Sequence, residues 1–376
     1  MRLTPHRGWL SPGHRPAGSL CDMRVIIANP PGYGGPDYDD HLCRELARLG
    51  VDVDLVTSRF RFGDVPQPAG YRRSELFYPL SSRLFRRSPL RVPLKLAEHP
   101  LGLARLALRT ADVVHVQWMT VPEMDRWLLR SRAPLVYTAH DMSDRRTGGR
   151  GGMWRKLYDR FDRVVAHSES GREALLEQGV RDEQLRVIPH PIIASDPVRS
   201  DDGRTLLCFG LIRPYKGIDD AIEVVKRVEG SRLLVAGDPM EPIERYQAAG
   251  GDLVEWRLGY LPGAEVDRAY GDATLAIFPY KPGLDQSGTL LRALGAGVPA
   301  VAYDVGGLGE NVRRFDAGRV VPAGDVAAMA AAVRELLDDP AKLEQARAGA
   351  RRARETLTWE ASARMHVAMY RELVSR

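Results

Sequence analysis

The fold is decided in the stretch from Thr205 to Val228, which reads TLLCFGLIRPYKGIDDAIEVVKRV. Its first residues form an apolar run typical of a buried parallel strand, and its last residues predict a helix. Between them stands Gly210-Leu211-Ile212-Arg213-Pro214-Tyr215-Lys216-Gly217, a loop bounded by glycines. A strand, a glycine loop and a helix in this order predict one unit of a parallel sheet with crossover helices.

The same alternation of strand and helix signals continues in both directions from this stretch. Apolar runs predict further strands at residues 25–28, 51–57, 113–116, 135–138, 163–167, 185–188, 232–236, 253–256, 275–278 and 300–303. The sequence therefore predicts an α/β protein with two Rossmann-like, doubly wound domains that face each other across a cleft, where ligands bind. We place the domains at residues 23–190 and 204–358, with a linker at residues 191–203.

Length and composition agree with two globular cores. The 376 residues are 44% hydrophobic and 27% charged, which excludes wholesale disorder and disulfide-scaffold classes. The three cysteines are far apart, so neither a disulfide framework nor a metal site is expected, and a reducing cytoplasm is the expected compartment. Residues 1–22 contain no apolar run and are expected to be a disordered extension. No run approaches the ~18 apolar residues that cross a bilayer.

Residues 71–109 are basic and apolar at the same time. This segment has nine arginine or lysine residues against Glu75 and Glu98, whereas the whole chain has a net charge of only +5. Such a composition suits the anionic surface of a membrane, where each basic residue contributes about 1 kcal/mol. It equally suits a pair of amphipathic helices with solvated arginines. No nucleic-acid motif accompanies the charge, so nucleic acid is not an expected partner.

The loop from Gly210 to Gly217 is the first candidate for chemistry. Arg213 and Lys216 lie three residues apart at the carboxyl edge of a predicted sheet. A planar guanidinium binds two phosphate oxygens and an ammonium adds a point charge, so the pair suits a diphosphate. From charge alone, an ordinary solvated loop explains these two cations equally well.

A second stretch favours the diphosphate interpretation. Residues 283–299 read GLDQSGTLLRALGAGVP and come soon after the predicted strand at 275–278. A helix is expected to begin near Ser287, so that its free backbone N–H groups point at whatever lies in the cleft. The phosphate ligands expected here are the amides of Ser287, Gly288 and Thr289.

With these residues the sequence resembles a known family, the retaining GT-B glycosyltransferases of the "glycosyl transferases group 1" type. The resemblance runs from Met23 to Arg376 and is sharpest in the second half. The motifs that carry it are the Gly210–Gly217 loop, Gly237-Asp238, Leu258-Gly259-Tyr260-Leu261, Phe278-Pro279, Ala296-Gly297-Val298-Pro299, Asp304-Val305-Gly306-Gly307 and Thr358-Trp359-Glu360. It implies the GT-B fold and a last helix, within residues 359–376, that packs back on the first domain.

The resemblance also implies roles for individual residues. Arg213 and Lys216 take the role of gripping the diphosphate of the donor, and His140 that of a histidine that reaches the transferred sugar. These three are the expected catalytic residues. The expected donor-binding residues are Gly34 and Gly35 of a glycine turn, Gly210, Tyr260 and Leu261 near the nucleobase, Asp285, Gln286, Ser287, Gly288, Thr289, Arg292 and Glu310.

The chain departs from the family at two positions. The family usually places one glutamate near the donor sugar and another on the nucleotide ribose, where this sequence has Leu284 and Arg292. Asp285 is one residue from the first position and is a candidate to replace that glutamate. Gln286-Ser287-Gly288 resembles a variant subgroup that retains the phosphate-binding turn.

The activity that the resemblance implies is that of a glycosyltransferase of the hexosyltransferase type. It would use a nucleotide-diphosphate sugar as co-substrate, with net retention and with neither metal nor other cofactor, and the leaving phosphate would take the proton of the acceptor. Two alternatives stay open, a sugar-nucleotide epimerase and a non-catalytic partner subunit that binds the sugar nucleotide. A nicotinamide-dependent dehydrogenase is less favoured, because Gly32-Tyr33-Gly34-Gly35 lacks the GxGxxG spacing.

The expected acceptor is a glycan or a small molecule. The basic and apolar segment at residues 71–109 favours a lipid-linked or membrane-proximal acceptor, as in the biosynthesis of surface polysaccharides. It also favours a peripheral position on the inner face of the membrane.

Overall fold

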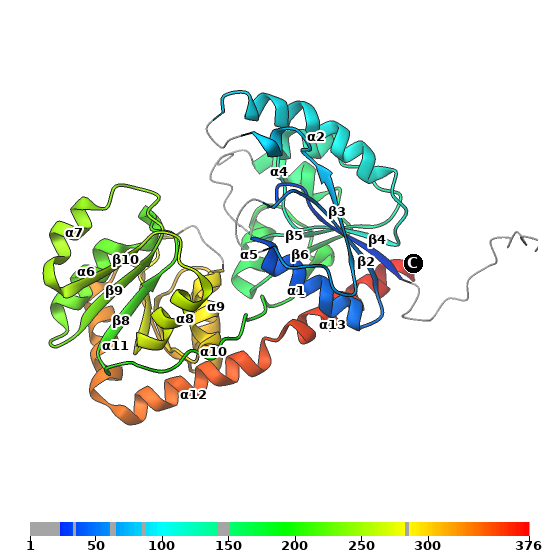
Figure 1. The fold of residues 1–376 in the computed structure, drawn as a ribbon. Helices are drawn as coiled ribbons and strands as arrows, with labels where there is room; N and C mark the ends of the chain where they lie inside the picture. The colour runs from blue at the N-terminus through cyan, green and yellow to red at the C-terminus, as the bar shows by residue number, and fades with distance from the viewer. Residues whose placement is uncertain are drawn as a thin grey trace, which may run out of the picture.

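The computed structural model describes residues 23–32, 35–60, 65–84, 88–140, 151–282 and 286–375. In this part of the chain there are two parallel sheets, one in each half, with helices packed against them (Figure 1). The alternation of strand and helix signals predicts two doubly wound α/β units, and both are confirmed. None of the described helices is long and apolar enough to span a membrane.

The first sheet has the strand order β3-β2-β1-β4-β5-β6-β7, and all its pairings are parallel. Its strands are β1 (Arg24–Asn29), β2 (Asp52–Ser58), β3 (Arg72–Phe77), β4 (Val113–Val116), β5 (Leu135–Thr138), β6 (Arg163–Ala166) and β7 (Leu185–Val187). The helices around it are α1 (Gly35–Arg48), α2 (Arg91–Ala107), α3 (Pro122–Leu128), α4 (Gly151–Tyr158), α5 (Glu169–Glu177) and α13 (Trp359–Val374). Helices α1 and α13 share the core on one face of the sheet, and α2, α4 and α5 share the core on the other.

The second sheet has the strand order β10-β9-β8-β11-β12-β13, again with parallel pairings. Its strands are β8 (Thr205–Phe209), β9 (Arg232–Gly237), β10 (Val254–Leu258), β11 (Leu275–Phe278), β12 (Ala300–Tyr303) and β13 (Gly318–Val321). The helices of this half are α6 (Ile218–Arg227), α7 (Glu244–Gly250), α8 (Gly263–Asp272), α9 (Gly288–Gly295), α10 (Leu308–Phe315), α11 (Val326–Asp338) and α12 (Pro340–Thr356). The central strands are buried on both faces, as their apolar runs predict.

Residues 71–109 do not form the pair of helices that their composition suits. They begin with the edge strand β3, and α2 follows as the long helix of the segment. Arg72 of β3 pairs with Asp52 of β2 at 2.9 Å, and the Ser74 hydroxyl donates to Asp54 at 3.0 Å. An edge strand accommodates such charged and polar residues, because one of its sides stays open to water. Cross-strand pairing therefore decides the conformation here.

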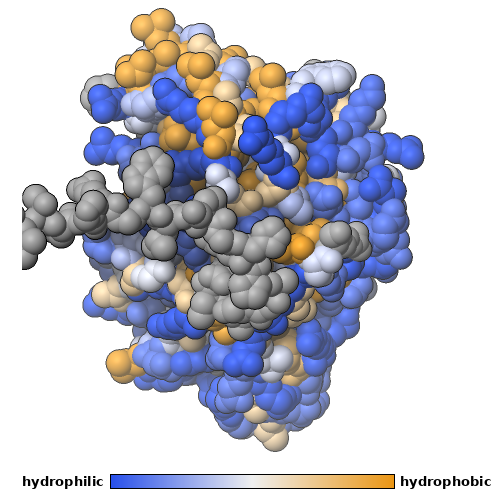
Figure 2. All heavy atoms as spheres, turned by 90° about the vertical axis from the view of Figure 1, so that its right-hand side faces the viewer, coloured by the Kyte–Doolittle hydropathy of each residue, from blue (hydrophilic) through white to orange (hydrophobic). Residues whose placement is uncertain are grey.

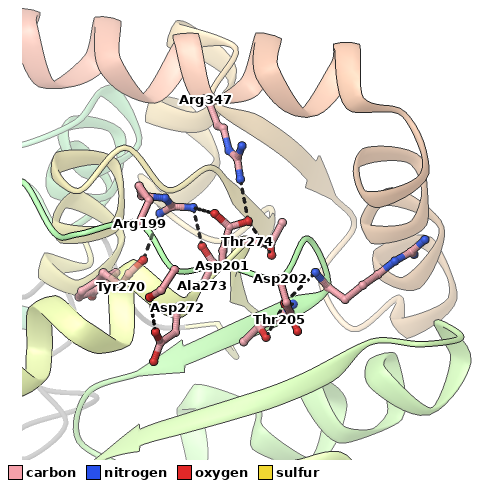
Figure 3. Close-up of polar contacts among 11 residues, drawn as sticks. Arg199, Asp201, Asp202, Thr205, Tyr270, Asp272, Ala273, Thr274 and Arg347 are labelled. Carbon is pink, nitrogen blue, oxygen red and sulfur yellow. Dashed lines mark hydrogen bonds and ion pairs between the residues drawn. The ribbon is translucent and has the colours of Figure 1, made fainter.

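The two domains are joined by the linker and by the last two helices. Figure 1 shows α12 running from the second domain toward the first, where α13 lies against α1. In the linker, Arg199 donates to the carbonyls of Tyr270 and Ala273 at 3.1 and 2.9 Å, and Arg347 of α12 pairs with Asp201 at 3.0 Å (Figure 3). Both connections are thus anchored on the second domain at neighbouring places.

Candidate active site

The loop from Gly210 to Gly217 follows β8 and is pressed against neighbouring elements. Gly210 has a φ of 105°, and a Cβ there would lie 2.9 Å from Thr289 Cγ2 and 3.3 Å from Lys216 Nζ. Gly217 has a φ of 67°, and its Cβ would lie 1.9 Å from the carbonyl oxygen of Pro279. Both positions need a left-handed backbone and no side chain, so these glycines let the loop approach α9 and the end of β11.

The side chain of Lys216 is buried under this loop, with the residue only 5% exposed. Its Nζ donates to the Phe209 carbonyl at 3.1 Å, to Thr289 Oγ1 at 3.2 Å and to the hydroxyl of Tyr280. Burial lowers the pKa of Lys216 below its usual value, and the nearby Arg213 contributes to the lowering. All three acceptors are neutral, so within the described ranges no carboxylate neutralises this ammonium.

Helix α9 begins next to the buried ammonium. Ser287 caps the helix by accepting a hydrogen bond from the Leu290 N–H at 3.3 Å, and the Thr289 hydroxyl lies 2.9 Å from the hydroxyls of both Ser287 and Tyr280. Gly288 is exposed, and no atom lies within 4 Å of the place where its Cβ would be. The positive end of α9 therefore faces open space beside a buried cation, an arrangement suited to phosphate.

Other expected donor residues surround this site with fewer contacts. Arg213 is half-buried, and its guanidinium makes no hydrogen bond or ion pair with any described residue. Arg292 is half-buried beside Tyr270; burial raises the pKa of that tyrosine, and the arginine opposes the rise. Tyr260 is 73% exposed and Leu261 is half-buried between β10 and α8. Arg213 and Tyr260 are thus available to a ligand, whereas Leu261 packs against the core of the second domain.

Gln286 and Glu310 have contacts that sequence reasoning does not reveal. Gln286 accepts a hydrogen bond from Asn311 Nδ2 at 3.5 Å. Glu310 of α10 accepts hydrogen bonds from the backbone N–H groups of Glu169 at 3.1 Å and Ser170 at 3.3 Å, which start α5 in the first domain. Its carboxylate thus caps a helix of the other domain and bridges the cleft.

Three positions of interest are not covered by the described ranges. Gly34, Leu284 and Asp285 lie outside the described residues, and Gly35 is the first residue of α1.

His140, the expected sugar-contacting residue, follows β5 and is half-buried. Its Nε2 lies 2.9 Å from Gln117 Oε1 and its Nδ1 lies 3.3 Å from His167 Nε2. Its ring stacks on Trp118 with centroids 4.5 Å apart and meets Tyr38 edge to face at 4.9 Å. The structure thus surrounds His140 with residues of its own domain and uses both ring nitrogens.

Asp39 of α1 is a candidate that sequence reasoning missed. Its carboxyl is buried and accepts a hydrogen bond at 2.6 Å from Nδ2 of Asn29, the last residue of β1. Burial raises its pKa to about 7, although the bond from Asn29 works against the rise. The carboxyl therefore titrates near neutral pH. Only the burial distinguishes this aspartate, and burial is invisible in a helix whose first turns carry several acidic residues.

Tyr280 is a second residue that was missed. Its hydroxyl is one of the acceptors of the Lys216 ammonium and contacts Thr289, so it links the loop to α9. Its position two residues after the end of β11 was the available signal, because the carboxyl ends of parallel strands line the ligand cleft.

Comparison with known proteins gives a consistent picture. Residues 38–195 match the model of "Glycosyltransferase Family 4", and residues 203–339 match that of "Glycosyl transferases group 1". A D-inositol 3-phosphate glycosyltransferase of Mycolicibacterium smegmatis is 25% identical over 346 residues, which cover 81% of this chain and 79% of that protein. An exopolysaccharide phosphotransferase of Streptomyces coelicolor is 30% identical over 260 residues, but these cover 66% of this chain and only 27% of that longer protein.

Solved structures resemble the arrangement of both domains. A sucrose-phosphate synthase of Thermosynechococcus elongatus has a TM-score of 0.72 at 21% identity, covering 94% of this chain and 99% of that one. The Anabaena protein HepE, solved with UDP and glucose, has a TM-score of 0.65 at 15% identity, covering 93% and 100%. These likenesses, together with the strand orders, show the two-domain GT-B fold.

Proposed function

Because this chain is a glycosyltransferase of the GT-B type, we propose that it transfers a hexose from a nucleotide-diphosphate donor, with retention and without a metal ion. The observation that carries this proposal is the buried Lys216 ammonium beside the open start of α9, with the free Arg213 guanidinium nearby. The HepE structure with UDP and glucose supports a nucleotide-sugar donor.

Each group would act on charge that develops during the reaction. The bond between the anomeric carbon and the phosphate oxygen breaks, and the electron pair stays on the diphosphate. Lys216, Arg213 and the first amides of α9 stabilise this charge, and groups that are already oriented toward a leaving group commonly make the largest contribution to rate. The acceptor oxygen bonds to the same carbon from the same face, and its proton passes to the leaving phosphate oxygen.

A thermal-shift screen with nucleoside diphosphates and their sugars tests the donor assignment. A ligand at 100 times its dissociation constant adds about 2.7 kcal/mol to the free energy of unfolding. We expect one nucleotide to raise the melting temperature, and NMR of the product to show the anomeric configuration of the donor. Conversion of the donor sugar without acceptor indicates an epimerase instead. Failure of every nucleotide diphosphate to stabilise the protein contradicts the proposal.

We also propose that the acceptor is lipid-linked and that α2 docks on an anionic membrane. Helix α2 and the residues just before and after it carry large exposed apolar side chains. These are Leu80, Leu90, Val92, Leu96, Leu101 and Leu108. Basic residues lie among them, including Arg91, Lys95 and Arg105. Figure 2 shows apolar and strongly hydrophilic side chains mixed at the upper end of this face. Burial of the leucines and attraction of the cations to anionic headgroups act together on such a surface.

A basic pocket lies between α3 and α4, and α3 packs against α2. It has a volume of about 330 Å³ and is lined by Arg126, Trp127, Arg130, Lys156, Asp159 and Arg160. Arg160 is used by the fold, because it donates to the carbonyls of Leu129 and Arg126. The other cations outnumber the carboxylate and suit a lipid phosphate. Liposomes of phosphatidylglycerol at low salt should sediment the protein and liposomes of phosphatidylcholine should not; equal behaviour contradicts membrane docking by charge.

A further inference from the structure

A chain of buried polar contacts runs through the first domain from the last helix of the protein. It starts at Tyr370 of α13, whose hydroxyl lies 2.6 Å from His115 Nδ1. The other ring nitrogen of His115 lies 2.7 Å from Thr138 Oγ1 and 3.4 Å from the amide of Gln117. All four residues are fully buried, so their polar atoms need partners within the protein.

The chain continues from Gln117 toward the cleft. The amide of Gln117 lies 2.9 Å from His140 Nε2, and His140 Nδ1 lies 3.3 Å from His167 Nε2. His167 Nδ1 ends the chain at the Ile188 carbonyl, 2.8 Å away. A carbonyl oxygen only accepts, so His167 must carry its proton on Nδ1.

The three histidines of this hydrogen-bond chain are neutral at physiological pH. Burial lowers the pKa of His115 and His140 well below the ordinary value and that of His167 to about 3. The titratable neighbours of His140 are His167, His190, His115 and His366, and each of them lowers its pKa further. A neutral imidazole has one N–H, so each ring donates at one nitrogen and accepts at the other.

This rule assigns the ring proton of each histidine in the hydrogen-bond chain. Because His167 has Nδ1–H, its Nε2 accepts from His140, which therefore has Nδ1–H and accepts at Nε2. In the structure the oxygen of the Gln117 amide faces His140 and its NH₂ group faces His115. The proton assignment requires this amide to be turned by half a turn, so that the NH₂ group donates to His140 and the oxygen accepts from His115. His115 accordingly carries Nε2–H and accepts at Nδ1 from the Tyr370 hydroxyl.

We propose that Tyr370 is a positioning residue that sets the tautomer and orientation of His140 through His115 and Gln117. The inference rests on the proposed function and on the role that the family resemblance implies for His140, that of reaching the transferred sugar. The stacked Trp118 keeps the His140 ring from turning, so the hydrogen-bond chain decides which nitrogen carries the proton. The helix that returns from the second domain is thereby part of the acceptor-side machinery.

NMR of the ¹⁵N-histidine-labelled protein tests the tautomers without any need for activity. Between pH 6 and 8 we expect His140 and His167 as Nδ1–H tautomers and His115 as the Nε2–H tautomer. Observation of His140 as Nε2–H, or as a cation at pH 7, overturns the proposal. If the tautomers are as expected and no sugar nucleotide is turned over, the proposed function fails and the hydrogen-bond chain stands.

A double-mutant cycle tests the positioning role. Tyr370→Phe should lower kcat about 3- to 10-fold, the size of one lost hydrogen bond, with the KM for the donor unchanged. In the Gln117→Leu background the same substitution should have no further effect, because the chain is already interrupted. Independent effects of the two substitutions on kcat overturn the proposal.

Tyr303→Phe is the matched control for this cycle. Tyr303 is also a fully buried tyrosine, and its hydroxyl donates to Asp220 at 2.9 Å in the second domain, away from the site. We expect a similar loss of melting temperature in Tyr303→Phe and an unchanged kcat. An equal fall of kcat in both variants shows a general effect of stability and also overturns the positioning role.

Discussion

The two domains present different kinds of surface to the cleft. In the second domain, the start of α9 faces open space beside the buried ammonium of Lys216, and the groups that hold this ammonium are neutral oxygen atoms. In the first domain, His140 is enclosed by aromatic rings and both of its nitrogens are used. The site in the second domain is thus organised around uncompensated positive charge, whereas the surroundings of His140 in the first domain are organised around neutral polar groups. Under the proposed function, the second domain would therefore stabilise charge, and the first domain would recognise its ligand by shape.

Removal of the Lys216 or Arg213 charge from the second domain should have the largest effect on kcat. Lys216→Ala should lower kcat by about 100-fold or more, because an oriented group that stabilises a leaving group typically contributes this much. Arg213→Ala should follow the same direction. Steady-state kinetics measures both, and Lys226→Ala, on the surface of α6, is the control with the same loss of charge. Near-normal turnover of both site variants would abolish the contrast between the domains.

Acid should destabilise the first domain selectively. All nine histidines lie outside residues 191–358. Burial lowers the pKa of His167 to about 3 and that of His190 and His366 to about 4. Below pH 6.5 these imidazoles become protonated in the unfolded chain but stay neutral in the folded protein. The free energy of unfolding therefore falls as the pH drops from 6.5 toward 4.

The expected loss is on the order of 1 kcal/mol per pH unit for each fully buried histidine, and less for the half-exposed His190. Asp39 acts in the opposite direction, because its raised pKa favours the folded state as it becomes protonated. Since the histidines outnumber it, calorimetry at pH 5 should show an early transition that is absent at pH 7.5. A single transition that shifts as a unit would mean that the domains share one response to acid.

One carboxylate added to the exposed side of α2 should weaken binding of the protein to anionic membranes. Leu108 is 83% exposed at the end of α2, so Leu108→Asp should leave folding intact and reduce binding to anionic liposomes several-fold, through lost burial and added repulsion. Co-sedimentation measures the change. Val198→Asp introduces the same charge at an exposed apolar residue of the linker, and its binding should match that of the wild type. Equal binding by all three proteins would place the membrane contact elsewhere.

Loss of the Glu310 charge, which bridges the two domains, should have the smallest effect on activity. Glu310→Gln keeps a hydrogen-bond acceptor at the start of α5 but removes the charge, and such helix-end charges contribute about 0.3–1 kcal/mol. We expect a slightly wider distribution of domain separations in small-angle scattering and a change in kcat below about threefold. A large fall in activity with unchanged scattering would instead place Glu310 on the donor.

The sequence predicted the parts that depend on local pattern. Apolar runs located the central strands, and the order of strand, glycine loop and helix located the place where Lys216 lies beside Thr289 of α9, although the phosphate role of these residues stays a prediction. It could not predict β3, because an edge strand with charged residues has the composition of a solvated helix. The bonds of Glu310 to α5 and of Tyr370 to His115 join residues more than a hundred positions apart, which no local pattern encodes.

The return of α13 has a consequence for synthesis of the chain on the ribosome. The core between β1, α1 and α13 contains Val367, Met369, Tyr370 and Leu373, which are made after the whole second domain. The first domain must therefore wait, with the part of its sheet that α13 covers still open, until α13 has been made. The half that is synthesised second can close its own core first, which reverses the usual vectorial order of folding.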